Sequence, residues 1–280
     1  MLSYQHGFHA GGPADVHKHA ILAIVLDHLR VKPKPFCVVD LFAGRAIYDL
    51  AADQARKTRE FEAGIGCGYG EATPPRSLAS YFAAIRWTNG GAGLHRYPGS
   101  PEIARLALRD GDQLFVNELH PAEHDALERW SRCDDRVHVH RRDGVEALGA
   151  LLPPPIKRGL AVVDPAFEMK EEYVSIPNAV ANAHRKWPQG CFLIWFPILA
   201  EARHRSSIDA LHREIDAPML SSTMMFPARR DAGLKGSLVT LINPPWEIES
   251  RLDEALGWLA AHTLEPLGAT HERSWLRPRT

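Results

Sequence analysis

Acidic side chains stand at or just after the ends of four short apolar runs in this sequence. The four acids are Asp40, Glu118, Asp143 and Asp164. In an open sheet of parallel strands, ligands bind beyond the carboxyl ends of the strands, where the strand order reverses. Because Asp also caps helices well, each acid taken singly has a structural explanation of about equal weight. A shared ligand site explains the four together better than four separate caps.

The acids have the chemistry to bind a nucleoside. Glu118 would accept hydrogen bonds from two ribose hydroxyls, and Asp143 would accept one from the exocyclic amine of adenine. The turn from Asp40 to Gly44 would let the backbone approach the ligand closely. The sequence has neither a GxGxxG motif between a strand and a helix nor a phosphate-binding GxxxxGK[ST] loop. A nucleoside without phosphates, such as S-adenosylmethionine (AdoMet), therefore fits better than NAD.

The residues from Asp164 to Phe167 read DPAF, which is close to the D/N/S-P-P-aromatic motif of enzymes that methylate planar amino nitrogens. Such nitrogens are poor nucleophiles. Asp164 and the carbonyl of Pro165 would accept their N–H bonds and direct electron density toward the methyl group. Phe167 would stack on a base that has left its helix. The structural alternative is an Asp-Pro turn that ends a strand.

A second segment, Asn243–Trp246, reads NPPW and fits that motif more closely than DPAF does. It follows the last predicted strand, which in AdoMet-dependent methyltransferases runs antiparallel to its neighbours. The end of such a strand lies at the edge of the sheet opposite to the cofactor. We therefore expect NPPW to be structural.

The elements that must position these residues alternate between short apolar runs and longer helical patterns, which predicts an α/β fold. The seven predicted strands are 36–41, 113–119, 137–140, 159–164, 191–196, 219–226 and 237–243. Their near-continuous apolar character indicates strands that are covered on both faces. A helix from Pro13 to Leu29 precedes them and could close over a ligand at the strand ends. We expect a Rossmann-like, mostly parallel sheet of the class I AdoMet-dependent methyltransferase type.

One interval breaks this rhythm. In a dinucleotide-binding fold, the acid that ends the second strand lies about 20 residues beyond the glycine loop. Here 78 positions separate Asp40 from Glu118. The excess, at about 51–97, contains a helical pattern at 77–87 and glycine-rich loops. We interpret it as a small helical insertion in a single domain that spans 1–280.

Composition limits the classes of function. The chain has 280 residues, 45% of them apolar, and a formal net charge of −1, so any nucleic-acid binding must use a local basic patch. Its four cysteines are far apart in sequence, which argues against a zinc ribbon or a disulfide framework. No apolar run approaches the roughly 20 residues of a membrane span, and the first residues lack the pattern of a signal peptide. We expect a soluble, cytoplasmic protein.

Several longer segments resemble the RlmJ family, which methylates N6 of an adenine in 23S ribosomal RNA. They are MLSYQHGFHAGGPADVHKHAIL at the start of the chain, YPGSP (97–101), NELHP (117–121), RRDG (141–144), RGLAVVDPAFEMK (158–170) and INPPWEIE (242–249). The resemblance runs nearly from end to end, and the opening segment is its most specific part. The family also has a helical insertion after the first strand.

The resemblance implies roles only at matching positions. It places six residues against AdoMet: His19, Ser100, Glu118, Asp143, Gly144 and Asp164. Asp164 would also be catalytic. Tyr4 would face the RNA, while His6 and Lys18 would lie near the target base; each of these three could instead be an ordinary packing or surface residue. The histidines near the N-terminus are not accompanied by cysteines or paired acids, so we expect no metal.

The sequence departs from the family pattern in three places. Phe42 replaces His, the triplet Gly44–Ala46 reads Gly-Arg-Ala in place of Gly-Ala-Gly, and Ala166 replaces the second proline of Pro-Pro-Tyr. These changes keep two alternatives open. One is a non-catalytic protein that binds RNA or AdoMet. The other is a methyltransferase for DNA adenine or for a protein amide. The leading hypothesis is methylation of 23S rRNA that is free of ribosomal proteins, with no membrane or protein partner.

Overall fold

An eight-stranded sheet runs through the centre of the molecule. The computed structural model describes residues 5–67, 69–70, 72–91, 93–227 and 233–279. In chain order the strands of this sheet are β1 (Cys37–Asp40), β4 (Gln113–Asn117), β5 (Val137–His140), β6 (Gly159–Val163), β7 (Cys191–Ile198), β8 (Met219–Met225), β9 (Gly236–Ile242) and β10 (Thr270–Arg277). Their order across the sheet is β10-β8-β9-β7-β6-β1-β4-β5. The five neighbouring strands β7, β6, β1, β4 and β5 run parallel to one another. Strand β9 runs antiparallel to both β7 and β8.

The predicted fold class is confirmed, but the predicted number of strands is wrong. All seven predicted strands are present, and β10 is an eighth that pairs antiparallel with β8 at the edge of the sheet. Its sequence, THERSWLR, contains few apolar residues, and along it exposed and partly buried positions alternate. A search for apolar runs misses such a strand, because polar and charged residues are typical of sheet edges.

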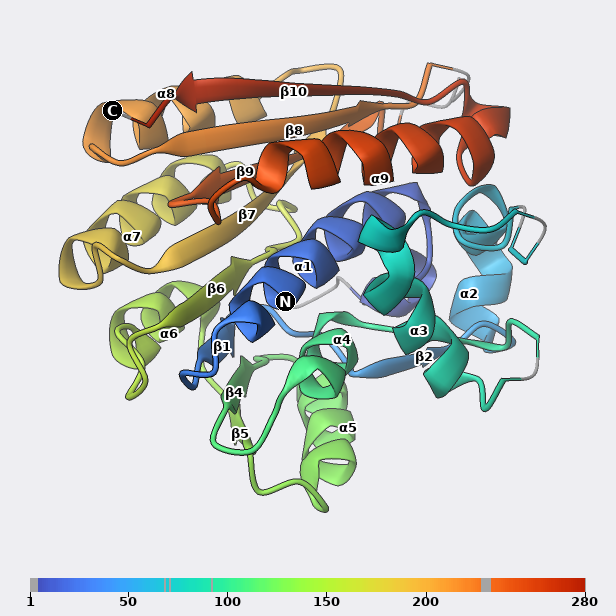
Figure 1. The fold of residues 1–280 in the computed structure, drawn as a ribbon, viewed down its shortest axis with the longest axis horizontal. Coiled ribbons are helices and arrows are strands. Elements are labelled where there is room, and N and C mark those ends of the chain that lie inside the picture. Colours follow the sequence, from blue (N-terminus) through green and yellow to red (C-terminus); the bar gives the residue numbers. More distant parts are fainter. Residues whose placement is uncertain (1–4, 68, 71, 92, 228–232, 280) are drawn as a thin grey trace.

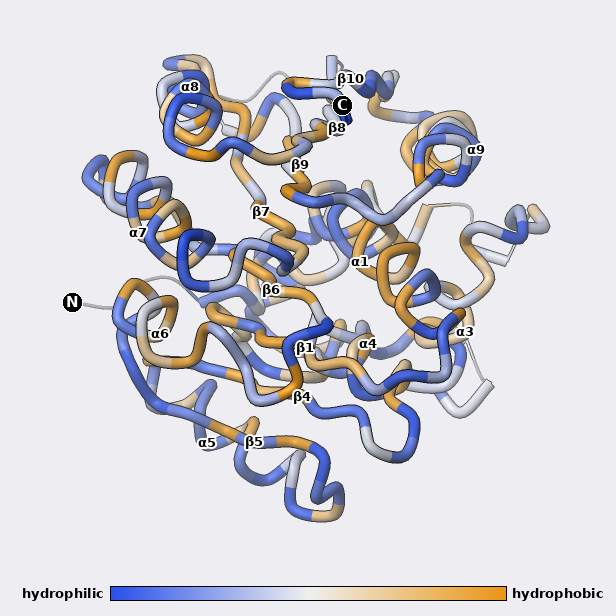
Figure 2. Tube along the Cα trace, turned by 60° about the vertical axis from the view of Figure 1, so that its left-hand side comes forward, coloured by the Kyte–Doolittle hydropathy of each residue, from blue (hydrophilic) through white to orange (hydrophobic). Residues whose placement is uncertain are grey.

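Helices cover both faces of the sheet (Figures 1 and 2). On one face lie α1 (Pro13–Val31), α3 (Ala79–Thr88), α4 (Ser100–Ala107) and α9 (Ile248–His262). On the other face lie α6 (Gly144–Leu151), α7 (Glu172–Lys186) and α8 (His204–Glu214), while α5 (Pro121–Ser131) packs against β5. Every residue of β1, β6 and β9 is buried, which explains their continuous apolar character.

Helix α1 begins at Pro13, as predicted, and crosses the middle of its layer. The missing N–H of proline is harmless at the first helical position, and Asp15 lies in the first turn. Residues at helical spacing from Val16 to Leu29 are buried against the sheet and against α3, α4 and α9. The helix therefore holds the side chains of its first turns at the carboxyl edge of the sheet.

The interval between β1 and β4 contains several short elements. They are β2 (Ile47–Asp49), α2 (Asp53–Thr58), the 3-10 turns Glu60–Ala63 and Arg76–Leu78, α3, β3 (Arg96–Pro98) and α4. Strands β2 and β3 form a separate antiparallel pair. The helix predicted at 77–87 is α3, which begins two residues later than expected. Two further 3-10 turns, His6–Phe8 and Glu265–Leu267, lie near the ends of the chain.

The strand register separates the two candidate motifs. Asp40 pairs with Val116 of β4 and Val162 of β6, so the carboxyl ends of three strands meet at one edge. Asn243 follows β9, whose last residue pairs with Phe192 near the start of β7. Its side-chain amide donates to the carbonyls of Pro188 and Gly190, at 2.8 and 2.9 Å. The NPPW segment therefore lies at the opposite edge, as predicted, and fixes the turn before β7.

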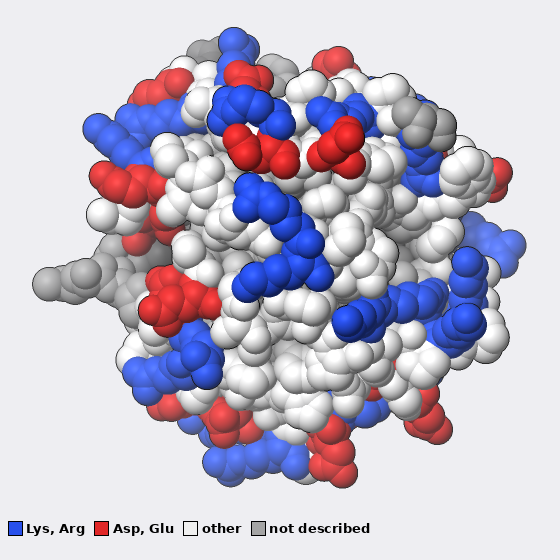
Figure 3. Space-filling model, turned by 90° about the vertical axis from the view of Figure 1, so that its left-hand side faces the viewer, with Lys and Arg blue, Asp and Glu red and all other residues white. Residues whose placement is uncertain are grey.

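No helix within the described residues is long and apolar enough to cross a membrane. Positive and negative side chains are interspersed over much of the face shown in Figure 3. On this face, the distribution agrees with the formal net charge of −1.

Candidate active site

A cavity of about 390 Å³ opens at the carboxyl ends of β1, β4 and β6. Nine of the predicted site residues line it: His6, Lys18, His19, Gly44, Ser100, Glu118, Asp143, Gly144 and Asp164. Three others, Asp40, Pro165 and Phe167, are buried beside it and do not line it. Tyr4 lies outside the described residues. The topology therefore brings together residues from six separate segments of the sequence.

The glycine turn after β1 closes around Glu118. Gly44 has a φ of +60°, and a Cβ at this position would lie 2.4 Å from the hydroxyl oxygen of Tyr48. Only glycine fits there without strain. The Gly44 amide donates to Glu118 Oε2 at 2.8 Å, and the His120 amide donates to Oε1 at 2.7 Å. The carboxylate is thus held at the end of β4, and each oxygen retains a lone pair for a ribose hydroxyl.

Asp143 caps helix α6 and also faces the cavity. The amides of Val145 and Glu146 both donate to its Oδ1, at 2.9 and 3.2 Å. The capping explanation is therefore correct, and it leaves Oδ2 available for an adenine amine. Gly144 follows, and a Cβ there would come within 2.1 Å of the Phe42 ring. The aromatic ring that replaces the family's histidine thus packs directly on this glycine.

The carboxyl group of Asp40 is buried beneath the cavity. Neither of its oxygens has a hydrogen-bond partner of normal geometry among the described residues. Burial raises the pKa of this carboxyl to about 7, the nearby Ser100 hydroxyl limits the increase, and the charge of Asp164 adds to it. Ser100 is the first residue of α4, so the site also faces the start of that helix. An unsatisfied acid here suits a positively charged ligand.

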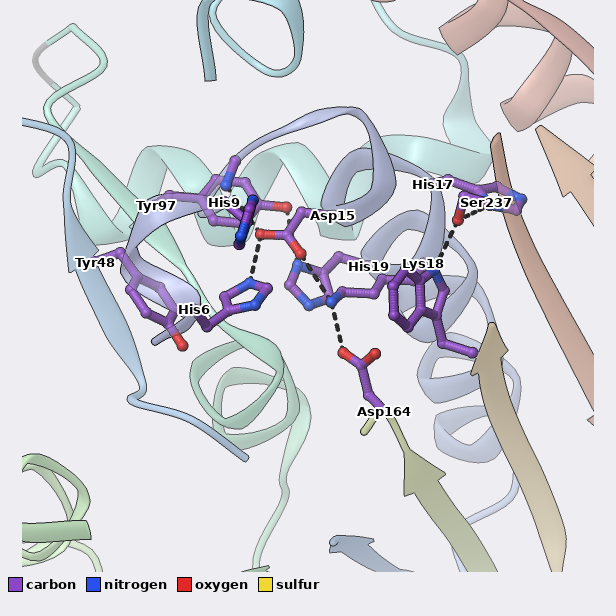
Figure 4. Close-up of polar contacts among 12 residues, drawn as sticks. His6, His9, Asp15, His17, Lys18, His19, Tyr48, Tyr97, Asp164 and Ser237 are labelled. Carbon is purple, nitrogen blue, oxygen red and sulfur yellow. Dashed lines mark hydrogen bonds and ion pairs between the residues drawn. The ribbon is translucent and has the colours of Figure 1, made fainter. Parts of the chain in front are cut away.

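Asp164 lies at the rim of the cavity and is paired with Lys18 (Figure 4). The Lys18 ammonium lies 2.5 Å from Asp164 Oδ2 and 2.9 Å from Asp15 Oδ1. Asp15 also accepts hydrogen bonds from the Gly11 amide and from His6, each at 2.9 Å. These charges connect the N-terminal segment, α1 and the end of β6.

Two histidines line the cavity in different ways. The Nε2 atom of His6 bonds to Asp15, and its ring lies 5.2 Å from that of Tyr48. The Nδ1 atom of His19 is 2.9 Å from the hydroxyl oxygen of Tyr97. Burial lowers the pKa of His19 to about 3, so this ring is neutral at physiological pH.

Phe167 does not project into the cavity in this structure. Its side chain is 6% exposed, and its ring packs 4.6 Å from Tyr173 and 5.2 Å from Phe196. It also has a φ of +53°, a conformation that is strained for an aromatic residue. Ala166, in contrast, lines the cavity. Stacking of Phe167 on a base would require the DPAF turn to change conformation.

Arg45, the bulky residue in the glycine turn, forms an ion pair with Glu123. Its guanidinium donates from Nε and a terminal nitrogen to the two carboxylate oxygens of Glu123, at 2.6 and 2.7 Å. Such a two-point pair fixes the orientation of both side chains. Arg45 itself does not line the cavity, whereas Glu123, the acid that neutralises its charge, does.

The residues fit AdoMet by their donor and acceptor chemistry. The cavity volume falls in the range of roughly 300–1,000 Å³ that small-molecule sites occupy. Glu118 and Asp143 offer acceptors for a nucleoside, and the buried acids suit a sulfonium. Within the described part of the chain, no three His, Cys, Asp or Glu side chains are placed to share a metal ion.

Sequence analysis missed several residues of the site. Asp15 was not among the predicted site residues, and neither was Trp195, whose ring centre lies 5.1 Å from the Lys18 nitrogen. Met169 and Glu172 also line the cavity. Asp15 lies on the apolar side of α1 and is buried there. A buried acid requires a partner, and this requirement could have identified Asp15 as a candidate site residue.

Comparisons with known proteins show the family to which this chain belongs. A family model described as "Ribosomal RNA large subunit methyltransferase D, RlmJ" matches residues 33–277. Two proteins named ribosomal RNA large subunit methyltransferase J align over 99% of this chain and 100% of their own lengths. That of Escherichia coli (strain K12) is 35% identical over 280 residues, and that of Haemophilus influenzae is 33% identical over 281 residues.

A crystal structure of a protein from Legionella pneumophila superimposes with a TM-score of 0.88 at 33% sequence identity, covering 95% of this chain and 98% of that one. The family match and the full-length similarity confirm the resemblance found in the sequence. This chain belongs to the RlmJ family of ribosomal RNA large subunit methyltransferases.

Proposed function

We propose that this protein uses AdoMet to methylate the N6 amine of an adenine in 23S ribosomal RNA. The single observation that carries the proposal is that Asp164, Glu118 and Asp143 line the same cavity. A carboxylate acceptor for the target amine thus stands next to acceptors for the cofactor's nucleoside. Membership of a family named for rRNA methylation supports the choice of substrate.

Different residues of this chain would bind the cofactor and the target amine. Bound AdoMet supplies an electrophilic methyl group. Glu118 would hold its ribose, and Asp143 its adenine amine. At the other end, Asp164 Oδ2 and the carbonyl of Pro165 would accept N–H bonds from the target amine and increase the electron density on its nitrogen. Because Asp164 is paired with Lys18 in this structure, that pair must open or rearrange as the target base arrives.

The RNA must reach the site without the help of a broad basic surface. The target base enters near His6 and Lys18, which line the cavity. Substrate RNA free of ribosomal proteins suits this arrangement, because the target adenine must leave its helix to reach Asp164. No membrane or protein partner is part of this proposal, and an rRNA substrate places the activity in the cytoplasm.

A transfer assay tests the proposal. Tritiated AdoMet would be supplied with 23S rRNA lacking its native modifications, both protein-free and in assembled subunits, and with an adenine-containing DNA. We expect transfer to protein-free rRNA, with N6-methyladenine as the product. Transfer to the DNA, or to amides of the ribosomal proteins in the assembled subunits, would favour those alternative substrates. AdoMet binding without transfer to any substrate would favour the non-catalytic alternative, to which Ala166 and Arg45 point.

A further inference from the structure

The ammonium group of Lys18 is shared between two carboxylates. Its Nζ lies 2.9 Å from Asp15 Oδ1 and 2.5 Å from Asp164 Oδ2, and the side chain is only 6% exposed. In the proposed reaction Asp164 must accept a hydrogen bond from the target amine. The Lys18 ammonium then needs partners that do not depend on Asp164, because an unpaired buried charge is strongly unfavourable.

Asp15 is the first such partner, and its own position is fixed. Its side chain is 1% exposed, and its Oδ2 accepts hydrogen bonds from the Gly11 amide and His6 Nε2, each at 2.9 Å. Burial alone would raise the pKa of Asp15, but the charges of His6 and Lys18 hold it well below its usual value. Asp15 therefore remains a carboxylate while Asp164 is engaged elsewhere.

The ring of Trp195 is the second partner. Lys18 Nζ lies 5.1 Å from the centre of this ring, within the range of a cation–π interaction. Trp195 is almost fully buried in β7, and its Nε1–H donates to the Ser237 hydroxyl at 2.9 Å. This hydrogen bond fixes the rotation of the indole, so its face stays directed at the ammonium.

A buried network continues from Ser237 into α1 (Figure 4). Ser237 Oγ is 2.9 Å from His17 Nδ1, and Ser222 Oγ is 2.9 Å from His17 Nε2. Burial lowers the pKa of His17 to about 3, so the ring is neutral, with one nitrogen that donates and one that accepts. His17 precedes Lys18 in the sequence. The network that holds the indole thus also anchors the turn of α1 that carries Lys18.

We propose that Asp15 and Trp195 are positioning residues that keep the Lys18 ammonium in place when Asp164 turns to the target amine. This inference rests on the proposed function. When Asp164 accepts a hydrogen bond from the target amine, Lys18 would lose its contact with that carboxylate. Asp15 and the indole face would remain in contact with the Lys18 ammonium. The proposed exchange is a rearrangement of hydrogen bonds, so no covalent bond is made or broken in it.

A double-mutant cycle tests this dependence on Lys18. Asp15→Asn, Trp195→Leu and Trp195→Phe would each be made in the wild type and in Lys18→Met. In the wild type we expect Asp15→Asn and Trp195→Leu to lower kcat roughly tenfold, and Trp195→Phe, which keeps a ring face, to lower it less. In Lys18→Met the same changes should have almost no further effect. If each substitution lowered kcat by the same factor in Lys18→Met as in the wild type, the proposal would be overturned.

A measurement that needs no activity separates this inference from the proposed function. In protein with ¹³C-labelled lysine, protons on the Cε of Lys18 should show an upfield ring-current shift caused by Trp195. Trp195→Leu should abolish this shift, and Trp87→Leu, which changes an indole that is 70% exposed, should leave it unchanged. A Lys18 signal that is the same in wild type and Trp195→Leu would overturn the inference. Failure of the wild type to methylate any RNA would instead contradict the proposed function.

Discussion

The two carboxylate oxygens of Glu118 each accept a hydrogen bond from a backbone amide, at Gly44 and at His120. The acceptor for a ribose is thus already oriented. A hydrogen bond to a charged group contributes about 1.5–3 kcal/mol, so Glu118→Ala should weaken AdoMet binding roughly tenfold or more. Titration calorimetry measures the change, with Glu118→Gln as a control of similar size. Unchanged affinity in Glu118→Ala would remove this residue from the cofactor site.

Asp40 gives a prediction about pH. Its pKa is raised to about 7 by burial, whereas in the unfolded chain it lies near 3.8. Between these values the folded protein holds a proton that the unfolded chain has lost, so stability falls as the pH rises through this window. Above pH 7 the buried carboxylate is charged and the loss is complete.

In the absence of cofactor, Asp40→Asn should therefore raise the free energy of unfolding at pH 8 by about 2–4 kcal/mol. The gain should shrink as the pH falls and should be small near pH 4, where Asp40 is protonated in the folded protein and about half protonated in the unfolded chain. Urea unfolding at pH 4, 6 and 8 measures it. A gain of equal size at all three values would show that the effect of the substitution does not come from the charge of Asp40.

A site residue could be predicted from the sequence when it stands at or just after the end of a predicted strand. Glu118, Asp143 and Asp164 were found in this way. Contacts between distant segments were not predictable, because neither Lys18 nor Trp195 carries in its local sequence any sign of the other. The orientation of Phe167 was also beyond prediction, since its φ of +53° depends on the turn that surrounds it.

At the scale of elements, the directions of two strands decide which motif can take part in chemistry. Asp164 follows β6 at the edge that holds the cavity, and Asn243 follows the antiparallel β9 at the other edge. Asp164→Ala should lower kcat about a hundredfold or more, in line with the loss of the hydrogen-bond acceptor for the target amine. Asn243→Ala should change kcat little, although it removes hydrogen bonds to the turn before β7 and should lower stability.

The measurement is methyl transfer to rRNA, after unfolding experiments have confirmed that both variants are folded. An inactive Asn243→Ala beside an active Asp164→Ala would reverse our choice between the motifs. The elements themselves were largely predictable, because buried parallel strands have continuous apolar sequences and α1 has a proline at its start. The strands that were not predicted are β10, which is half exposed and lacks that pattern, and the short pair β2 and β3.

At the scale of the whole molecule, the expectation of one domain over 1–280 remains a prediction. The packing supports it, because α1 contacts α3 from the proposed insertion at 51–97 as well as α9 near the C-terminus. We expect a single cooperative unfolding transition, with equal calorimetric and van't Hoff enthalpies. AdoMet at a hundred times its Kd should add about 2.7 kcal/mol to the free energy of unfolding. Two separate transitions, of which AdoMet shifts only one, would contradict a single domain.

The hydrogen bonds of His17 to Ser237 and Ser222 also affect how the chain folds during its synthesis. Its partner Ser237 lies 220 positions further along the chain. At a synthesis rate of about 5–20 residues per second, α1 emerges on the order of 10–40 s before that partner exists. During this interval the apolar side of α1 is without the strands that bury it, and the nascent chain is exposed to aggregation. A polypeptide that terminates before β9 would therefore lack the Ser237 hydroxyl that anchors His17 and Trp195, however much of the sheet it had formed.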